Sequence, residues 1–519
     1  MFTDVPDHGR ACSSTVVPCQ ALQRPVITDF VAFLLALMVG AVLTIVVRNR
    51  AVRLGWYDQA NSSRKVHAQP VPRLGGVAIV LAFNAPITAL LFVDSGVAHI
   101  FRQQRELILG LYVGGFAIAA LGLYDDLYGA GAKLKFSVQT GVALALYAIG
   151  FRIETLSWPF GPSLALGAFA LPFTVFWIVG VINAMNLIDG LDGLAGGVAL
   201  FVVVANFILA ISRNDVLESL AMAALGGAVL GFLIFNFSPA SIFMGDTGSM
   251  FLGFVLAAIA VKTSTKSGTT VAMLVPIIAL GLPIMDTLLA MIRRAVLGRS
   301  LFDSDKDHIH HRLMARLRLS QRGAVLVLYG LCCLFALTAL GLAFANGVQS
   351  AMLLVAVSVV VFVLMRKLGY LDLREGHGAT LIRRRNHHLR YLLREVVRNL
   401  QASANLADLW NSLRPLAEEL GAARLELQIY KTAGAHRDSV LFEAERPAGE
   451  SFPVAARVEL AHGERRLGFL AMTWRDGRVE LDRDDELGLE LIADALAVVA
   501  ARLTLPPIPA AENVLSIRR

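Results

Sequence analysis

Apolar residues recur along the first 370 residues in runs of roughly twenty, the length at which a helix can cross a bilayer. Short polar loops separate the runs. A buried core helix can imitate one such run, but not many in series. We therefore predict an all-α polytopic membrane bundle of about eleven helices. The expected spans are 27–47, 74–93, 106–124, 134–150, 164–182, 194–212, 218–236, 248–262, 270–291, 324–344 and 348–366.

The pattern changes after about residue 368. The segment 380–400 is basic, with apolar residues on one helical stripe. Alternating apolar positions then predict strands over 425–429 and 454–460, a third strand over 467–474 and a helix after Asp485. This order predicts a small soluble α+β domain at the C-terminal end. We expect four parts: a polar tail over 1–26, a transmembrane domain over 27–367, a basic helical linker over 368–403 and the α+β domain over 404–519.

Lysine and arginine are divided unevenly among the loops. The loops 48–73 and 292–323 are rich in both residues, whereas the alternate loops are poor. Because basic loops stay in the cytoplasm, we expect these two loops and the C-terminus inside and the N-terminus outside. The first apolar run begins near Val26 and is typical of a signal anchor.

Composition agrees with a membrane protein. The chain is 56% hydrophobic and 17% charged, whereas soluble proteins are about 45–50% apolar and about 25% charged. The net charge of +7 is accounted for by the basic loops, and no motif points to nucleic acid. Four cysteines are too few for a disulfide scaffold.

Five polar clusters lie at span ends, and the expected topology puts all five on the cytoplasmic face. Hydropathy fixed the spans independently of these clusters, so their common side is informative. Ionisable residues at membrane depth are costly and usually functional. The clusters are Lys65 to Gly76, Asp125-Asp126 with Lys133, Asn183 to Gly193, Asn236 with Phe243 to Gly248, and Asp286 to Arg312.

These residue types favour phosphoryl transfer, which needs positioning and charge neutralisation more than covalent protein chemistry. Carboxylates that hold Mg²⁺ suit a diphosphate substrate. Each cluster alone also fits a simpler structure, such as a solvated helix end, an Asx turn or a pH-sensitive histidine surface. Zinc is disfavoured, because the histidines lack cysteine partners and the helical H-E-x-x-H arrangement.

In this order, the clusters resemble those of the polyprenyl-phosphate N-acetylhexosamine-1-phosphate transferase superfamily. The resemblance covers residues 27–370 and is closest to the WecA/TagO-type branch, because of the stretch from Arg293 to Leu313. The peptidoglycan-precursor translocase branch has a different histidine loop. The segment beyond residue 400 is similar, far more weakly, to a GAF-type domain.

The resemblance implies a role for each matching residue. Asp125 and Asp126 match the catalytic aspartate pair, and Asp246 matches the Mg²⁺ ligand, for which Mn²⁺ is a substitute. The remaining matches are to residues that bind the substrates. They are Lys65 and Lys133 near the diphosphate, Asn186, Asp189, Asp192 and Asn236 around the nucleotide and metal, and Arg294, His308, His310, His311 and Arg312 at the sugar.

The resemblance therefore implies an enzyme of the bacterial inner membrane with its active site in the cytoplasm. It would transfer HexNAc-1-phosphate, by default GlcNAc-1-phosphate, from a UDP-sugar to undecaprenyl phosphate and release UMP. This is the first membrane step of a cell-surface polysaccharide. Direct attack and an aspartyl-phosphosugar intermediate are both open at this point.

Two other classes stay open as alternatives. A cation-coupled transporter would carry charges at the bilayer midplane and broken helices, whereas these charges lie at span ends. A membrane-anchored sensor would use the GAF-like domain, which could bind a regulatory ligand or a protein. The basic helix over 380–400 could lie on an anionic leaflet, pair with a copy of itself in a homodimer, or only connect the two domains.

Overall fold

The computed structural model describes most of the membrane part of the chain and the regular elements beyond it. The described residues are 19–56, 71–93, 97, 100, 104–156, 164–266, 274–296, 308–370, 391–402, 406–419, 422–430, 437–443, 456–462, 465–474 and 483–504. They fall into two compact units. One comprises Met1–Arg293 and Phe302–Asp372, and the other Arg294–Leu301 and Leu373–Arg519.

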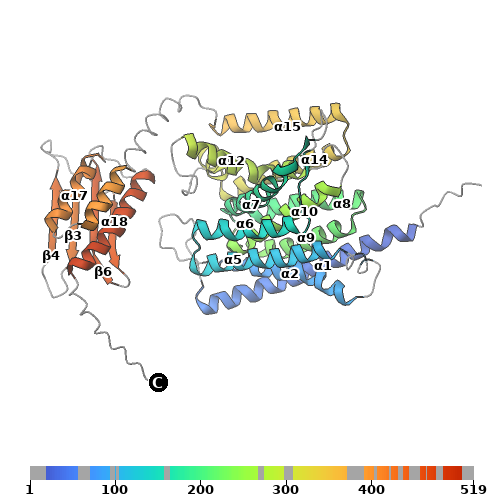
Figure 1. Cartoon of the computed structure of the whole chain (residues 1–519), viewed down its shortest axis with the longest axis horizontal. Coiled ribbons are helices and arrows are strands. Elements are labelled where there is room, and N and C mark those ends of the chain that lie inside the picture. The colour runs from blue at the N-terminus through green and yellow to red at the C-terminus, as the bar shows by residue number, and fades with distance from the viewer. Residues whose placement is uncertain are drawn as a thin grey trace, which may run out of the picture. The chain divides into compact units, whose positions relative to one another are not determined.

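The first unit is a helix bundle (Figure 1). Eight of its described helices are long and apolar enough to cross a membrane. The chain is therefore a multi-pass membrane protein. These helices are α1 (Cys19–Leu54), α2 (Gly75–Phe92), α7 (Ala170–Ile188), α8 (Leu194–Ser212), α9 (Val216–Asn236), α10 (Gly245–Lys266), α14 (Gln321–Phe344) and α15 (Gly347–Lys367).

Three further expected spans are helical but shorter or interrupted, so the number eleven stays a prediction. Helix α6 (Ala132–Ala148) has only 17 residues. The segment 105–128 consists of α4 (Arg105–Leu109), a π-helical turn η1 (Gly110–Gly114) and α5 (Gly115–Tyr128). In η1, the ring of Phe254 fills the place that a Cβ on Gly114 would take.

The span expected over 270–291 is divided into α11 (Leu274–Ala279) and α12 (Gly281–Val296). The break lies at Leu280, a turn residue. Pro283 explains the break, because a proline has no N–H with which to bond the carbonyl of Ala279 four residues earlier. The short helix α13 (Ile309–Leu317) follows later in the chain.

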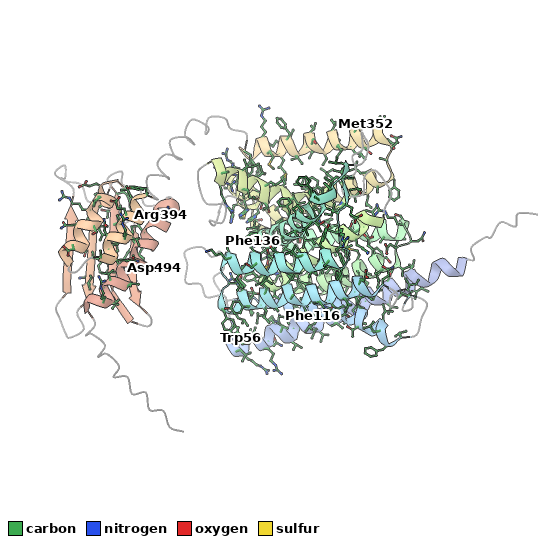
Figure 2. All side chains as sticks on the ribbon, viewed as in Figure 1. Trp56, Phe116, Phe136, Met352, Arg394 and Asp494 are labelled. Atoms are coloured by element: carbon green, nitrogen blue, oxygen red, sulfur yellow. The ribbon has the colours of Figure 1, made fainter. Side chains whose placement is uncertain are left out.

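Helix α10 is the centre of the bundle. It packs against α2, α5 and α7, and its residues from Met250 to Val261 are all buried. The outermost apolar side chains instead face away from the protein. Met352 on α15 is 68% exposed and Phe116 on α5 is 44% exposed (Figure 2). Such an apolar surface is stable against lipid chains rather than against water.

Helices α1 and α9 approach each other through glycine. A Cβ on Gly231 of α9 would lie 2.5 Å from the carbonyl oxygen of Leu37, and one on Gly40 of α1 would lie 3.0 Å from that of Ala228. Lipid is as apolar as these side chains, so association inside a bilayer depends on close packing. The missing side chains are therefore what allows the two helices to touch.

The second unit contains an antiparallel four-stranded sheet in the order β4-β3-β6-β5. The strands are β3 (Ala422–Tyr430), β4 (Arg437–Glu443), β5 (Ala456–His462) and β6 (Arg465–Trp474). Helix α17 (Leu406–Glu419) packs on β3, and α18 (Arg483–Thr504) packs on β5 and β6. A further helix covers 391–402. Sequence periodicity indicated β3, β5, β6 and α18 but not β4.

The α1–α9 contact gives a first prediction. Gly231→Ala should destabilise the bundle by about 1–3 kcal/mol, because the new Cβ meets main chain that cannot move without separating the helices. Thermal unfolding in detergent measures the effect. Gly180→Ala in α7 is the matched control, since nothing lies within 4 Å of its Cβ position. Equal melting temperatures for the two variants would contradict the proposed glycine contact.

Candidate active site

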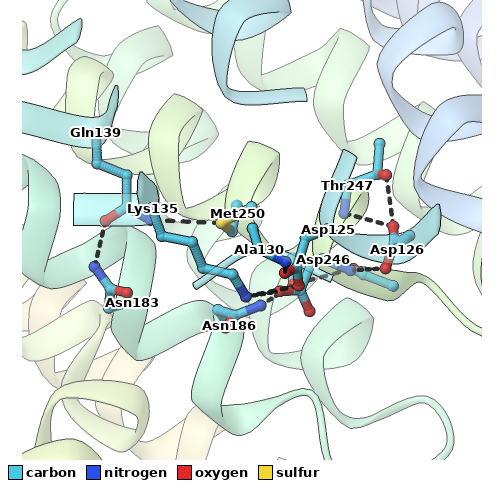
Figure 3. Close-up of polar contacts among 12 residues, drawn as sticks. Asp125, Asp126, Ala130, Lys135, Gln139, Asn183, Asn186, Asp246, Thr247 and Met250 are labelled. Carbon is cyan, nitrogen blue, oxygen red and sulfur yellow. Dashed lines mark hydrogen bonds and ion pairs between the residues drawn. The ribbon is translucent and has the colours of Figure 1, made fainter. Parts of the chain in front are cut away.

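Three helix ends meet at the centre of the candidate site (Figure 3). Asp125 lies in the last turn of α5, Asp246 in the first turn of α10, and Lys135 in the first turn of α6. The ammonium nitrogen Nζ of Lys135 lies 2.6 Å from Oδ2 of Asp125 and 2.6 Å from Oδ2 of Asp246. Two carboxylates from segments more than a hundred residues apart thus converge on one cation.

The neighbouring Asp126 has different contacts. Its carboxylate accepts hydrogen bonds from the backbone N–H of Asp246 at 2.8 Å, from that of Thr247 at 3.0 Å and from the Thr247 hydroxyl at 2.6 Å. These N–H groups belong to the first turn of α10 and lack partners within the helix. Asp126 therefore caps α10 from another helix and holds Asp246 in place, whereas Asp125 faces the cation.

Glycines bring the backbones around this centre together. The place for a Cβ on Gly76 is filled by the backbone of Gly248, and that on Gly122 by the backbone of Thr247. Gly245 has φ +70° and lies against the Asp126 carboxylate. The N–H of Gly76 also donates to the carbonyl of Met244 at 2.8 Å. Helices α2, α5 and α10 are thus packed main chain to main chain beneath the carboxylates.

The turn after α7 forms one side of the centre. Asn186 donates to the hydroxyl of Ser249 at 3.0 Å, and Ser249 donates to the carbonyl of Gly245 at 3.0 Å. Asp189 lies beyond the end of α7. Burial, followed by the nearby charges of Asp246 and Asp126, raises the pKa of Asp189 to about 7. A cation bound here would favour its ionised form.

Both backbone polar groups of Gly193 are hydrogen-bonded to side chains. Its N–H donates to Oδ1 of Asn236 at 3.1 Å, and its carbonyl accepts from the Tyr329 hydroxyl at 2.6 Å. Nδ2 of Asn236 also donates to the carbonyl of Ile242 at 2.9 Å. Asp192 accepts from the N–H of Ala240 at 3.0 Å. Asn236, Asp192 and Tyr329 therefore shape the turn that carries Asp189.

The histidine helix α13 reaches the same turn. A Cβ on Gly190 would lie 3.0 Å from Nε2 of His310, so this ring packs directly on the turn. The ring of His311 lies 4.3 Å from that of His310. Burial, helped by the charge of His311, lowers the pKa of His310 to about 3, which leaves its ring neutral at pH 7. His308 is buried as well and lies next to α12.

The remaining sequence candidates lie in different places. The guanidinium of Arg312 lies over the Tyr370 ring at 4.1 Å, and Arg294 is buried in α12. Lys133 is exposed. Lys65 lies outside the described residues. The structure thus brings Asp125, Asp126, Asn186, Asp189 and Asp246 together, with His310 beside them.

Lys135 is the residue that the sequence interpretation missed. Lys133 and Lys135 differ by about 200° around a helix, because successive residues turn by about 100°. The sequence contained a helical pattern that could have identified Lys135. Gln139 lies four residues after Lys135 on the same face and accepts from Nδ2 of Asn183 at 2.7 Å. A polar pair at this spacing marks the inward face of α6, which Lys133 does not share.

The residues at the centre fit a hard divalent cation. Asp125 and Asp246 already converge on a positive charge, and their donors are oxygens, which Mg²⁺ prefers. Among the residues that the structure describes, no three His, Cys, Asp or Glu side chains form a metal cluster. One or two carboxylates suffice when a substrate's phosphate oxygens complete the coordination of Mg²⁺.

Comparison with known proteins gives the family. The model of glycosyl transferase family 4 matches residues 108–264, which include Asp125, Lys135 and Asp246. This family is a divalent-metal-dependent class of transferases.

The alignments with several named relatives cover most of each relative's length. The chain is 40% identical over 320 residues to a probable undecaprenyl-phosphate N-acetylglucosaminyl 1-phosphate transferase of Bacillus subtilis. The aligned residues make up 62% of this chain and 86% of the relative. It is 36% identical over 310 residues to a decaprenyl-phosphate N-acetylglucosaminephosphotransferase of Mycobacterium tuberculosis, covering 54% and 74%. It is 33% identical over 257 residues to a phospho-N-acetylmuramoyl-pentapeptide-transferase of Halalkalibacterium halodurans, covering 47% and 75%. On this similarity and the family match, the chain belongs to glycosyl transferase family 4.

Proposed function

We propose that the chain transfers GlcNAc-1-phosphate from UDP-GlcNAc to undecaprenyl phosphate and releases UMP. The observation that carries the proposal is the meeting of Asp125, Asp246 and Lys135 at helix ends. A membrane-embedded acceptor and a water-soluble diphosphate donor can meet only at such a boundary. The names of the relatives from Bacillus and Mycobacterium support the same donor sugar and a polyprenyl acceptor.

We place the site on the cytoplasmic side of a bacterial plasma membrane. The order of the spans along the sequence puts the basic loops at the same ends of the spans as the carboxylates, and we expect such loops to stay inside. Arg48, at the start of the basic loop 48–73, contacts the segment that precedes Asp246. Its guanidinium lies 5.8 Å from the Phe235 ring and 3.3 Å from the Ser241 hydroxyl, just before Asp246 in the chain.

In the proposed reaction, an oxygen of the lipid phosphate attacks the β-phosphorus of the UDP-sugar. The bond from that phosphorus to the bridging oxygen breaks, and UMP leaves with the electron pair. Asp125 and Asp246 would hold Mg²⁺, which neutralises charge on the donor's phosphates when bound. Lys135 would neutralise further phosphate charge. Asp126 would keep Asp246 aligned through its cap on α10.

The sugar end of the donor would lie towards α13. His310 packs on the turn that carries Asp189, and His308, His311 and Arg312 belong to the same short segment. We propose that this segment recognises the N-acetylated hexosamine. A neutral His310 offers one donor and one acceptor, the chemistry that sugar hydroxyls and an acetamido group require.

Purified full-length protein tests the function directly. UDP-GlcNAc, undecaprenyl phosphate and Mg²⁺ should together give UMP and a lipid-linked sugar diphosphate, and omission of the lipid should abolish UMP release. Other UDP-HexNAc donors in parallel reactions identify the preferred sugar. No UMP from any of these donors in a folded preparation would refute the proposal.

The carboxylates give a second prediction. Asp246→Asn and Asp125→Asn should each lower kcat at least about 100-fold, because charge is lost with little change of shape. Mn²⁺ should partly replace Mg²⁺, whereas Ca²⁺ should support turnover poorly because it prefers longer bonds and more ligands. Activity within about tenfold of wild type for Asp246→Asn would remove this residue from the metal site.

The two lysines give a third prediction. Lys135→Met should lower kcat/KM for UDP-GlcNAc by about 100-fold, since two half-buried carboxylates would lose their cation. Lys133→Met, on the exposed side of the same turn, should cost at least about tenfold less. UMP release under identical conditions measures both. The reverse order of the two losses would favour Lys133 as the phosphate ligand.

The C-terminal domain gives a fourth prediction. All candidate residues precede residue 313, and α15 ends at Lys367. A chain truncated near Gly376 should therefore still insert and still release UMP. We propose that the soluble domain, which we expect to be GAF-like, modulates rate, dimerisation or partner choice through a ligand or protein. A truncated protein that is folded and binds donor, yet shows no turnover, would refute this division.

A further inference from the structure

Asp286 of α12 is a buried carboxylate whose two oxygens have different partners. Asp286 is only 3% exposed. Oδ2 lies 2.9 Å from Nδ1 of His308, and Oδ1 accepts the backbone N–H of Ile309 at 2.9 Å. A buried carboxylate is costly unless both oxygens are satisfied. Here both partners come from the start of α13.

The first contact fixes the protonation pattern of a ring. A carboxylate can only accept hydrogen bonds, so Nδ1 of His308 must carry the hydrogen. The free position of the ring is then Nε2. Carboxylates that orient a functional histidine in this way set both its tautomer and its ring angle.

The second contact seats the helix. His308 is the N-cap residue of α13, but its side chain makes no capping bond. Asp286 supplies that bond from α12, where a negative charge also suits the positive end of the helix. The position of α13 therefore depends on a residue 22 positions earlier in the chain.

The contacts that begin at Asp286 continue to the turn that carries Asp189. The rings of His308 and His310 are stacked with centroids 5.7 Å apart and an interplanar angle of 3°. His310 in turn packs on Gly190. Asp286, His308, His310 and Gly190 thus form one continuous row of contacts from α12 to the turn at the side of the centre.

We propose that Asp286 is the positioning residue for donor recognition: it fixes the tautomer of His308 and seats α13 so that the histidines meet the sugar end of the UDP-sugar. This inference rests on the proposed function. Asp286 does not touch the donor itself and acts through His308.

Asp286→Asn should keep the contact with Ile309 and change the contact with His308. The N–H of Ile309 can only donate, so the amide oxygen must face it and the helix stays capped. The amide nitrogen then faces His308 and donates to Nδ1, which moves the ring hydrogen to Nε2. The substitution therefore preserves the fold and inverts the tautomer.

The experiment measures UMP release with full-length protein while each substrate is varied in turn. Asp286→Asn should lower kcat/KM for UDP-GlcNAc by about 10–100-fold. KM for undecaprenyl phosphate and the melting temperature should stay close to the wild-type values. Asp215→Asn is the matched control, because Asp215 caps α9 by accepting the N–H of Glu218 at 3.2 Å and asparagine caps equally well. It should retain wild-type kinetics.

A double-mutant cycle tests action through His308. His308→Asn places an amide donor near the former Nδ1 but has no counterpart of Nε2. In this background, Asp286→Asn should change donor kcat/KM by less than about threefold, since no tautomer is left to invert. Independent losses that multiply would overturn the inference. So would wild-type donor kinetics for Asp286→Asn, or equal losses for both substrates with a lowered melting temperature. Wild-type protein that releases no UMP would refute the proposed function instead.

Discussion

The cap that Asp126 places on α10 is the contact on which the centre of the bundle depends. Three hydrogen bonds join the last turns of α5 to the first turn of α10. Within a membrane protein, N–H groups at a helix start must find partners in the protein, because lipid offers none. The same bonds fix Asp246 opposite Asp125, so that both carboxylates reach Lys135. The two adjacent aspartates thus have separate contacts, since Asp126 caps α10 and Asp125 pairs with Lys135.

Close backbone packing makes that arrangement attainable. Gly76, Gly122 and Gly248 leave room for α2, α5 and α10 to meet main chain to main chain. A methyl group at Gly76 or Gly122 would push apart the helices whose ends carry the carboxylates. Small residues therefore shape the candidate site through packing alone. The same principle holds α1 against α9.

Two later helices, α13 and α14, contact the candidate site. Tyr329 of α14 holds the carbonyl of Gly193, and α13 brings His310 onto Gly190. Both contacts act on the single turn after α7 that carries Asp189. The proposed recognition of the sugar and the proposed handling of the phosphates thus share one piece of backbone. Asp286, which seats α13, would influence that turn from α12.

The sequence by itself determined the membrane bundle and singled out the aspartates that meet at its centre. Hydropathy and charge are local properties, and each can be read from a window of about twenty residues. Only the tertiary structure decided that Lys135 rather than Lys133 joins Asp125 and Asp246, because that choice depends on the rotation of α6 against α10. It also decided that Asn236 and Tyr329 hold Gly193, and that Asp286 caps α13. Such contacts join segments tens to hundreds of residues apart. Their geometry follows from how whole helices pack. The spacing of Lys135 and Gln139 indicates which face of α6 turns inward, but not which residues that face meets.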